Sequence, residues 1–182
     1  QEPASALRLF TFLARHNLQP APETVRRIRE ALPHIERHFS QPGPHWQPLV
    51  ELLARPHAAQ ALRLMNAIGL LGAVLPEWRR IECLLRRDFY HRYTVDEHTL
   101  HAIRALEELS AAATGARVAL ARLAGQIRHP ELVRFALLLH DIGKAEAHDG
   151  QRAQFAVAGN LFHIIGKEGR FVGQRWGTGF HA

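Results

Sequence analysis

Two His-Asp dipeptides follow a dense apolar run in the stretch LLLHDIGKAEAHDG, residues 137–150. The first pair, His140-Asp141, comes directly after a segment that is apolar on nearly all sides. Burying a charged carboxylate beside an imidazole is costly unless a partner compensates the charge. Imidazole nitrogen and carboxylate oxygen both bind divalent metals, so a metal ion is a suitable partner. The first pair is therefore a candidate metal site.

A metal site here needs a further ligand from another segment. Adjacent side chains on a helix point about 100° apart and do not converge on one ion unaided. His98 is the natural third ligand, because it lies on a predicted amphipathic helix at the border of its apolar face. A His-Asp hydrogen bond that caps helices, with no metal, explains the pair equally well. Periodicity alone leaves both interpretations open.

The second pair, His148-Asp149, lies in the polar segment KAEAHDGQR. Asp149 followed by Gly150 is typical of a turn, so a solvated turn is the favoured interpretation of this pair. His148 is within reach of the first pair from such a loop, whereas Asp149 is the weaker candidate.

The elements that position these residues are predicted to be helices, because apolar residues recur at helical spacing along most of the chain. Gly69 is well suited to end one of them in a left-handed conformation, and Pro76 to open another after a short apolar link. The helix that begins at Pro130 is apolar nearly all round, so we expect it at the centre of the bundle. The expected helices cover residues 4–16, 22–35, 49–54, 56–68, 94–109, 118–127 and 130–143.

The fold class that follows is all-α, a helical bundle with an irregular C-terminal tail. From Gly159 the sequence is rich in glycine and shows neither helical nor strand periodicity. With 47% hydrophobic residues among 182, the chain has enough apolar side chains to bury a core.

The composition indicates the cellular compartment in which the protein is expected. A single cysteine, Cys83, excludes an intrachain disulfide and a Cys-rich zinc site, and fits a reducing compartment. The longest apolar runs, such as residues 68–75, are too short to span a bilayer, and the N-terminus lacks the layout of a signal peptide. We therefore expect a cytoplasmic protein without a membrane partner.

The net charge is +6, a balance that can indicate nucleic acid or another phosphate-bearing partner. The arginines are scattered along the chain, and the few aromatic residues are not interleaved with them as a stacking platform requires. Direct nucleic-acid binding is therefore not expected.

Three stretches together resemble a known family. The segments DFYHRYTVDEHTL (residues 88–100) and LLLHDIGK (residues 137–144) resemble the HD-domain phosphohydrolase superfamily. More closely, they resemble the uridylyltransferase/uridylyl-removing enzymes that modify the PII nitrogen-signalling protein. The segment LRLMNAIGLLGAVLPEWRRIECLL (residues 62–85) resembles the helical region that precedes the HD domain in those enzymes.

The resemblance implies an all-α HD-type bundle in which His98, His140 and Asp141 bind Mg²⁺ or Mn²⁺. It also implies a reaction, the hydrolytic removal of uridylyl groups from uridylylated PII. Lys144 would then face a phosphate oxygen, although a lysine that complements a helix C-terminus explains its position equally well. His148 would assist catalysis, through a loose match to a later histidine of the family.

The same resemblance divides the chain into a helical linker region (residues 1–86), a partial HD domain (87–158) and a tail foreign to the family (159–182). The superfamily takes a further aspartate from a later helix, and no aspartate follows Asp149. The family's nucleotidyltransferase domain is not matched either. We therefore expect an incomplete hydrolase, with weak metal binding and little hydrolysis. The alternative is a non-catalytic helical interaction or linker module that retains the HD motif as structure.

Overall fold

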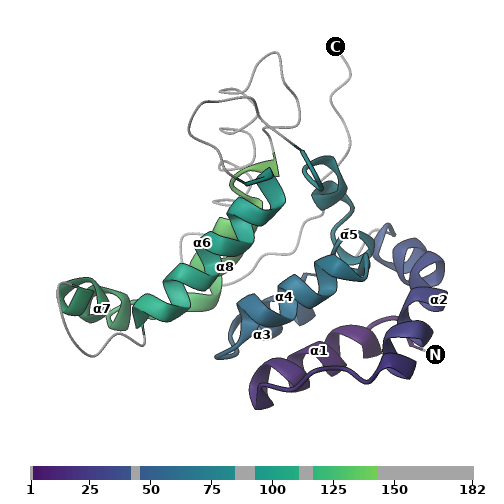
Figure 1. Cartoon of the computed structure of the whole chain (residues 1–182), viewed down its shortest axis with the longest axis horizontal. Coiled ribbons are helices and arrows are strands. Elements are labelled where there is room, and N and C mark those ends of the chain that lie inside the picture. Colours follow the sequence, from purple (N-terminus) through teal and green to yellow (C-terminus); the bar gives the residue numbers. More distant parts are fainter. Residues whose placement is uncertain (1, 42–45, 85–92, 111–116, 143–182) are drawn as a thin grey trace, which may run out of the picture.

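The computed structural model describes residues 2–41, 46–84, 93–110 and 117–142, and within these ranges every regular element is helical (Figure 1). The all-α prediction is therefore confirmed for this part of the chain. The elements are α1 (Ser5–His16), α2 (Pro22–Phe39), α3 (Gln47–Leu53), α4 (Ala58–Ala67), α5 (Leu70–Val74), the 3-10 helix η1 (Pro76–Arg80), α6 (Val95–Ser110), α7 (Val118–Gly125) and α8 (Pro130–Leu139).

The helices pack around one hydrophobic core. Helix α1 lies against α3 and α4, and α2 lies against α5. Helices α6 and α8 run side by side, with α7 at their far end (Figure 1). The pair joins the rest because α4 packs on α6 and α3 packs on α8. Fully buried members of the core include Leu7, Leu62, Trp78, Ile103 and Leu138.

Several elements differ from the sequence-based prediction, and α2 continues four residues beyond its expected end, to Phe39. Helix α8 ends at Leu139, so His140 and Asp141 follow the helix rather than form its last turn. The segment from Leu70 to Val74, expected as an irregular link, forms the short helix α5. Pro76 opens a single 3-10 segment rather than a full helix. The predicted Gly-rich tail lies wholly outside the described residues.

Helix α8 is fully buried along one face rather than all round, in the part of the chain that the structure describes. It packs against α3 and α6. Leu137 is half-buried against the core, and Leu132 and Val133 are half-buried as well. When a helix is apolar on nearly all sides, its sequence does not indicate which face is buried. The buried face is then set by the helices that pack against it. The buried residues of α8 are Arg134, Phe135, Leu138 and Leu139.

Helix α6 is buried over its first turns, more narrowly than its apolar spacing suggests. Val95 and Ile103 are buried, but the apolar residues Ala102, Leu106 and Leu109 are only partly covered. Burial is concentrated in the first half of α6, and it includes two polar residues. The buried residues of α6 are Val95, Asp96, Thr99, Leu100 and Ile103.

Gly69 ends the α4 segment in a left-handed backbone conformation, with φ of +79°, as the sequence predicts. Its amide donates to the carbonyl of Asn66, and the next residue begins α5. A Cβ added here would lie 3.4 Å from Leu32 Cδ1, an ordinary contact distance. Glycine is therefore required by the backbone conformation and not by lack of space.

Gly69→Ala is expected to lower the free energy of unfolding by about 1 kcal/mol, because an L-residue with a Cβ is disfavoured in the left-handed region. Urea denaturation followed by circular dichroism measures this change. Gly125→Ala is the matched control, since Gly125 ends α7 and a Cβ there would meet nothing within 4 Å. Equal effects of the two substitutions would contradict the conformational explanation.

A buried arginine joins α8 to the N-terminal helices. The Arg134 guanidinium donates to the carbonyl oxygens of Leu53 and Arg55, at the end of α3 and just after it. Its Nε lies 3.9 Å from Glu107 Oε1 on α6, and Glu107 accepts a hydrogen bond from the Ala59 amide on α4. Burial raises the pKa of Glu107 above its ordinary value, although the Ala59 hydrogen bond and the Arg134 charge act to lower it. Desolvation therefore outweighs these two stabilising contacts at Glu107.

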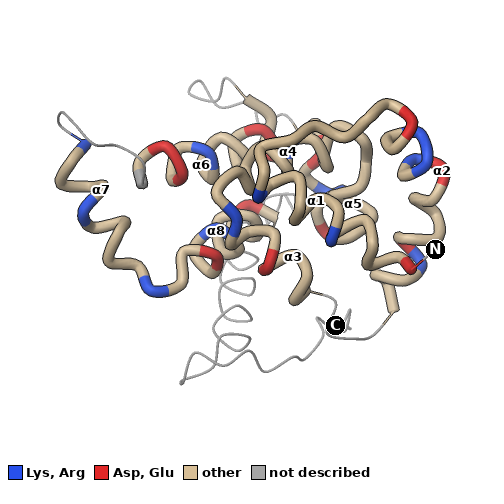
Figure 2. Tube along the Cα trace, turned by 90° about the horizontal axis from the view of Figure 1, so that it is seen from below, with Lys and Arg blue, Asp and Glu red and all other residues tan. Residues whose placement is uncertain are grey.

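Charges of both signs are spread over the described helices (Figure 2). Many form local pairs, such as Arg26 with Glu23 and Glu30 on α2, and Arg79 with Glu36 between η1 and α2. This agrees with the scattered arginines noted in the sequence. Among the described helices, none has both the length and the apolar character needed to cross a membrane.

Candidate metal centre

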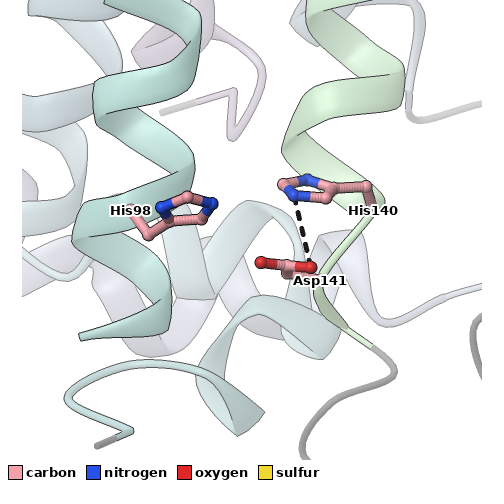
Figure 3. A group of neighbouring side chains, drawn as sticks. All are labelled: His98, His140 and Asp141. Carbon is pink, nitrogen blue, oxygen red and sulfur yellow. Dashed lines mark ion pairs between the residues drawn. The ribbon is translucent and has the colours of Figure 1, made fainter. Parts of the chain in front are cut away.

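Three of the predicted site residues converge at one end of the α6–α8 pair. His98 projects from α6, while His140 and Asp141 follow the end of α8 (Figure 3). One ligand atom from each residue can be chosen so that all three lie within 4.8 Å of one another. The pair is antiparallel, because the start of α6 lies beside the end of α8. This arrangement brings His98 together with two residues that lie 42 and 43 positions later in the sequence.

His140 contacts Asp141 although its own backbone keeps helical dihedral angles, with φ of −59° and ψ of −30°. Within a regular helix His140 and Asp141 would point about 100° apart. In the turn after Leu139, the two side chains face each other, with His140 Nε2 at 3.2 Å from Asp141 Oδ1 (Figure 3). This turn agrees with the sequence-based expectation that adjacent residues converge only near a helix end.

The hydrogen bonding of His140 assigns its ring nitrogens. His140 Nδ1 lies 2.6 Å from the carbonyl oxygen of Leu137. A carbonyl oxygen only accepts, so Nδ1 carries the hydrogen of this contact. A histidine that binds a metal commonly donates its other N–H to such a carbonyl, which fixes the tautomer and the ring orientation. In the neutral ring, the lone pair then lies on Nε2, the atom that faces Asp141.

A lone pair on His140 Nε2 facing a carboxylate oxygen is repulsive unless a proton or a cation lies between or beside them. Three arrangements remove the repulsion. His140 is protonated and donates to Asp141, or both groups bind one cation, or a protonated Asp141 donates to the Nε2 lone pair. The first is the capping ion pair and the second is the metal site, the same two interpretations that the sequence leaves open.

The surroundings favour compensation of the Asp141 charge. Asp141 is only 2% exposed, whereas the His140 side chain is 38% exposed. The His98 ring is half-buried, and its centroid lies 6.1 Å from that of His140. Ligands on opposite sides of an ion such as Mg²⁺ are about 4 Å apart. The three side chains therefore need only small movements to share an ion.

The donor set also bears on which metal fits. The carboxylate suits both Mg²⁺ and Mn²⁺, but the two imidazoles are nitrogen donors, which suit transition metals better than Mg²⁺, a cation that prefers oxygen ligands. Of the two ions expected from the sequence, the residues present fit Mn²⁺ better. Lys144 and His148, the two predicted catalytic residues, lie outside the described part of the chain and stay predictions.

Two polar residues near the site were not identified from the sequence. Asp96, two residues before His98, is 4% exposed, and Thr99 is fully buried. Asp96 and Thr99 lie on the same face of the helix as the apolar residues Leu100 and Ile103. This helical spacing is the sequence pattern that predicts their burial. Reading this face only from its apolar residues left them out.

The comparisons with known proteins bear on the identity of the chain. Residues 1–74 match the family described as the uridylyltransferase GlnD third domain. The chain is 35% identical over 153 residues to the bifunctional uridylyltransferase/uridylyl-removing enzyme of Thiobacillus denitrificans, covering 82% of the chain and 18% of the relative. The enzyme of the same name from Rhodopseudomonas palustris is 30% identical over 162 residues, or 88% of the chain and 17% of the relative.

A third relative of the same name, from a Bradyrhizobium species, is 28% identical over 167 residues, or 91% of the chain and 18% of the relative. The chain thus spans less than a fifth of the length of these curated relatives. The sequence similarity extends well beyond residues 1–74 and includes most of the chain. The chain is therefore homologous to one segment of the bifunctional uridylyltransferase/uridylyl-removing enzymes.

Proposed function

We propose that the chain carries part of an HD-type hydrolytic site that removes uridylyl groups from uridylylated PII. The observation that carries the proposal is the convergence of His98, His140 and Asp141 from two antiparallel segments. Homology to enzymes whose name includes uridylyl removal supports the same chemistry. The reaction is the hydrolysis of a phosphodiester, in which water adds to phosphorus and the bond to the protein hydroxyl breaks.

In this proposal His98, His140 and Asp141 would bind a divalent cation, with Mn²⁺ the better match to the donors. Such an ion lowers the pKa of bound water and neutralises phosphate charge. The Leu137 carbonyl holds the His140 ring so that Nε2 faces the site. The buried Asp141 carboxylate supplies negative charge where water is largely excluded. Lys144 is proposed to contact a phosphate oxygen and His148 to assist proton transfer.

The second candidate is a non-catalytic helical module that retains the motif as structure. The direct His140–Asp141 contact favours it, because a protonated His140 would satisfy Asp141 without a metal. The two candidates differ in catalysis, and the hydrolytic site also needs a cation.

Release of UMP from uridylylated PII distinguishes the two candidates. We expect slow release of UMP that depends on added Mn²⁺ and stops when a chelator is added. The rate should fall at least about tenfold in His98→Ala. His98 is a proposed ligand, and even the loss of a residue that only supports a ligand costs about tenfold. Arg104→Ala, on an exposed position of α6, serves as the control and should release UMP at the wild-type rate. Mn²⁺ binding without any UMP release would favour the non-catalytic module.

A further inference from the structure

A hydrogen-bonded relay connects η1 and α4 to the first turn of α6. Trp78 Nε1 donates to Asn66 Oδ1 at 2.8 Å, and Asn66 Nδ2 donates to Asp96 Oδ2 at 3.2 Å. Trp78 is fully buried and Asp96 is 4% exposed, so both ends of the relay are shielded from water. Hydrogen bonds in such surroundings are costly to break, because the separated groups have no water to replace them.

The direction of the relay is fixed by the chemistry of its members. An indole N–H only donates, so the Asn66 carbonyl must face Trp78. The Asn66 amide group then faces Asp96, and an ionised carboxylate only accepts. Asn66 therefore fits between the two neighbours in one orientation.

The relay lies behind His98 as seen from the metal centre. Side chains two residues apart on a helix point about 200° apart. Asp96 faces Asn66 on α4. His98 faces the end of α8 (Figure 3). The same turn of α6 is held by the Val95 amide, which donates to the Leu84 carbonyl at 3.0 Å. Arg63 and Glu97 form a further pair across α4 and α6, but both side chains are at least a third exposed.

We propose that Asn66 and Asp96 are positioning residues, which set the place of the His98 ring relative to His140 and Asp141 by fixing the first turn of α6. The consequence for metal binding rests on the proposed function. Neither residue is a ligand. Their effect passes through the backbone of two residues, so we expect about a tenfold change in metal affinity, the lower end of what outer-shell partners contribute.

A double-mutant cycle of wild type, the two single variants and the double variant tests this role. Asn66→Asp places two carboxylates against each other, so it should weaken Mn²⁺ binding about tenfold in calorimetry. Asp96→Asn keeps an oxygen that accepts from Asn66 and should stay within about twofold of wild type. The double variant Asn66→Asp/Asp96→Asn reverses the second hydrogen bond, since the introduced carboxylate would accept both from Trp78 and from the introduced amide on α6. It should restore the affinity that Asn66→Asp alone loses.

The matched control is Arg63→Gln, which removes the exposed pair between the same two helices. Exposed pairs contribute little, so affinity should stay within about twofold of wild type. Thermal melting without metal reports folding separately from binding. A loss of melting temperature with unchanged Mn²⁺ affinity in Asn66→Asp, or failure of the double variant to restore affinity, would overturn the positioning role.

A metal-free readout separates this proposal from the proposed function. The imidazole NMR signals of His98 should shift in Asn66→Asp and return in the double variant, while those of His129, at the opposite end of α8 from the site, stay in place. If wild type binds no Mn²⁺, the metal site is refuted, and the His98 signals still decide the positioning role. Unchanged His98 signals in Asn66→Asp would reject it.

Discussion

Asp141→Ala is expected to abolish the calorimetric Mn²⁺ isotherm that wild type gives, a loss of affinity of at least about 100-fold. Asp141 supplies the only carboxylate among the three converging residues, and it is almost completely buried. Without its charge, the three converging residues would offer the ion two imidazoles and no anionic group. The melting temperature of wild type should rise with Mn²⁺, because a ligand that binds only the folded state stabilises it. The variant should show no rise.

Asp141→Asn separates the metal site from the capping ion pair. The amide keeps an oxygen that accepts from a protonated His140, so the capping contact would survive in part. It removes the negative charge, so Mn²⁺ binding should be lost as in the alanine variant. Glu108→Ala, which removes an exposed carboxylate from α6, is the control and should bind as wild type does. Indistinguishable isotherms for wild type and Asp141→Ala would remove the metal site.

Arg134→Ala should destabilise the fold by about 3 kcal/mol, the range measured when one partner of a buried pair is removed. The Leu53 and Arg55 carbonyls lose their side-chain donor, and Glu107 loses the nearest cation. The desolvation that already raises the pKa of Glu107 is then no longer offset by Arg134. At this chain length the melting temperature should fall by about 6–12 °C.

Arg104→Ala gives the comparison for Arg134→Ala. Arg104 pairs with Glu108 at 2.7 Å on the exposed side of α6, where such pairs contribute little. Its loss should change the free energy of unfolding by no more than about 0.5 kcal/mol. Similar destabilisation by both substitutions would show that the buried contacts of Arg134 add nothing beyond an ordinary surface pair.

The sequence predicted most of the helices because their start and stop signals are local. Pro22 opens α2, Pro130 opens α8, and Gly69 takes the left-handed conformation expected of it. The meeting of His98 with His140 and Asp141 was also expected. The helical spacing placed His98 beside the buried face of α6, and the resemblance to the HD superfamily paired it with the dipeptide. These features depend on short stretches of sequence.

Contacts between distant segments were not predictable in the same way. Arg134 sits in an apolar run, and its acceptors lie about eighty positions earlier in the chain. Nothing near Asn66 in the sequence indicates that its amide meets Asp96. The end of α8 at Leu139 is likewise not marked by glycine or proline, since Gly143 comes later. Each depends on how the helices pack, and a single sequence does not encode packing in any local pattern.

The contacts of Arg134 with the end of α3 have a consequence for which segments of the gene can recombine independently. The predicted boundary near residue 86 separates a linker region from the segment that bears the proposed ligands, yet the guanidinium on one side depends on carbonyls of the other. A gene fusion that transferred only residues 93–142 would move the three converging side chains without the Leu53 and Arg55 acceptors. Recombination in this family should therefore keep α3 and α4 together with α6 and α8, as one inherited unit.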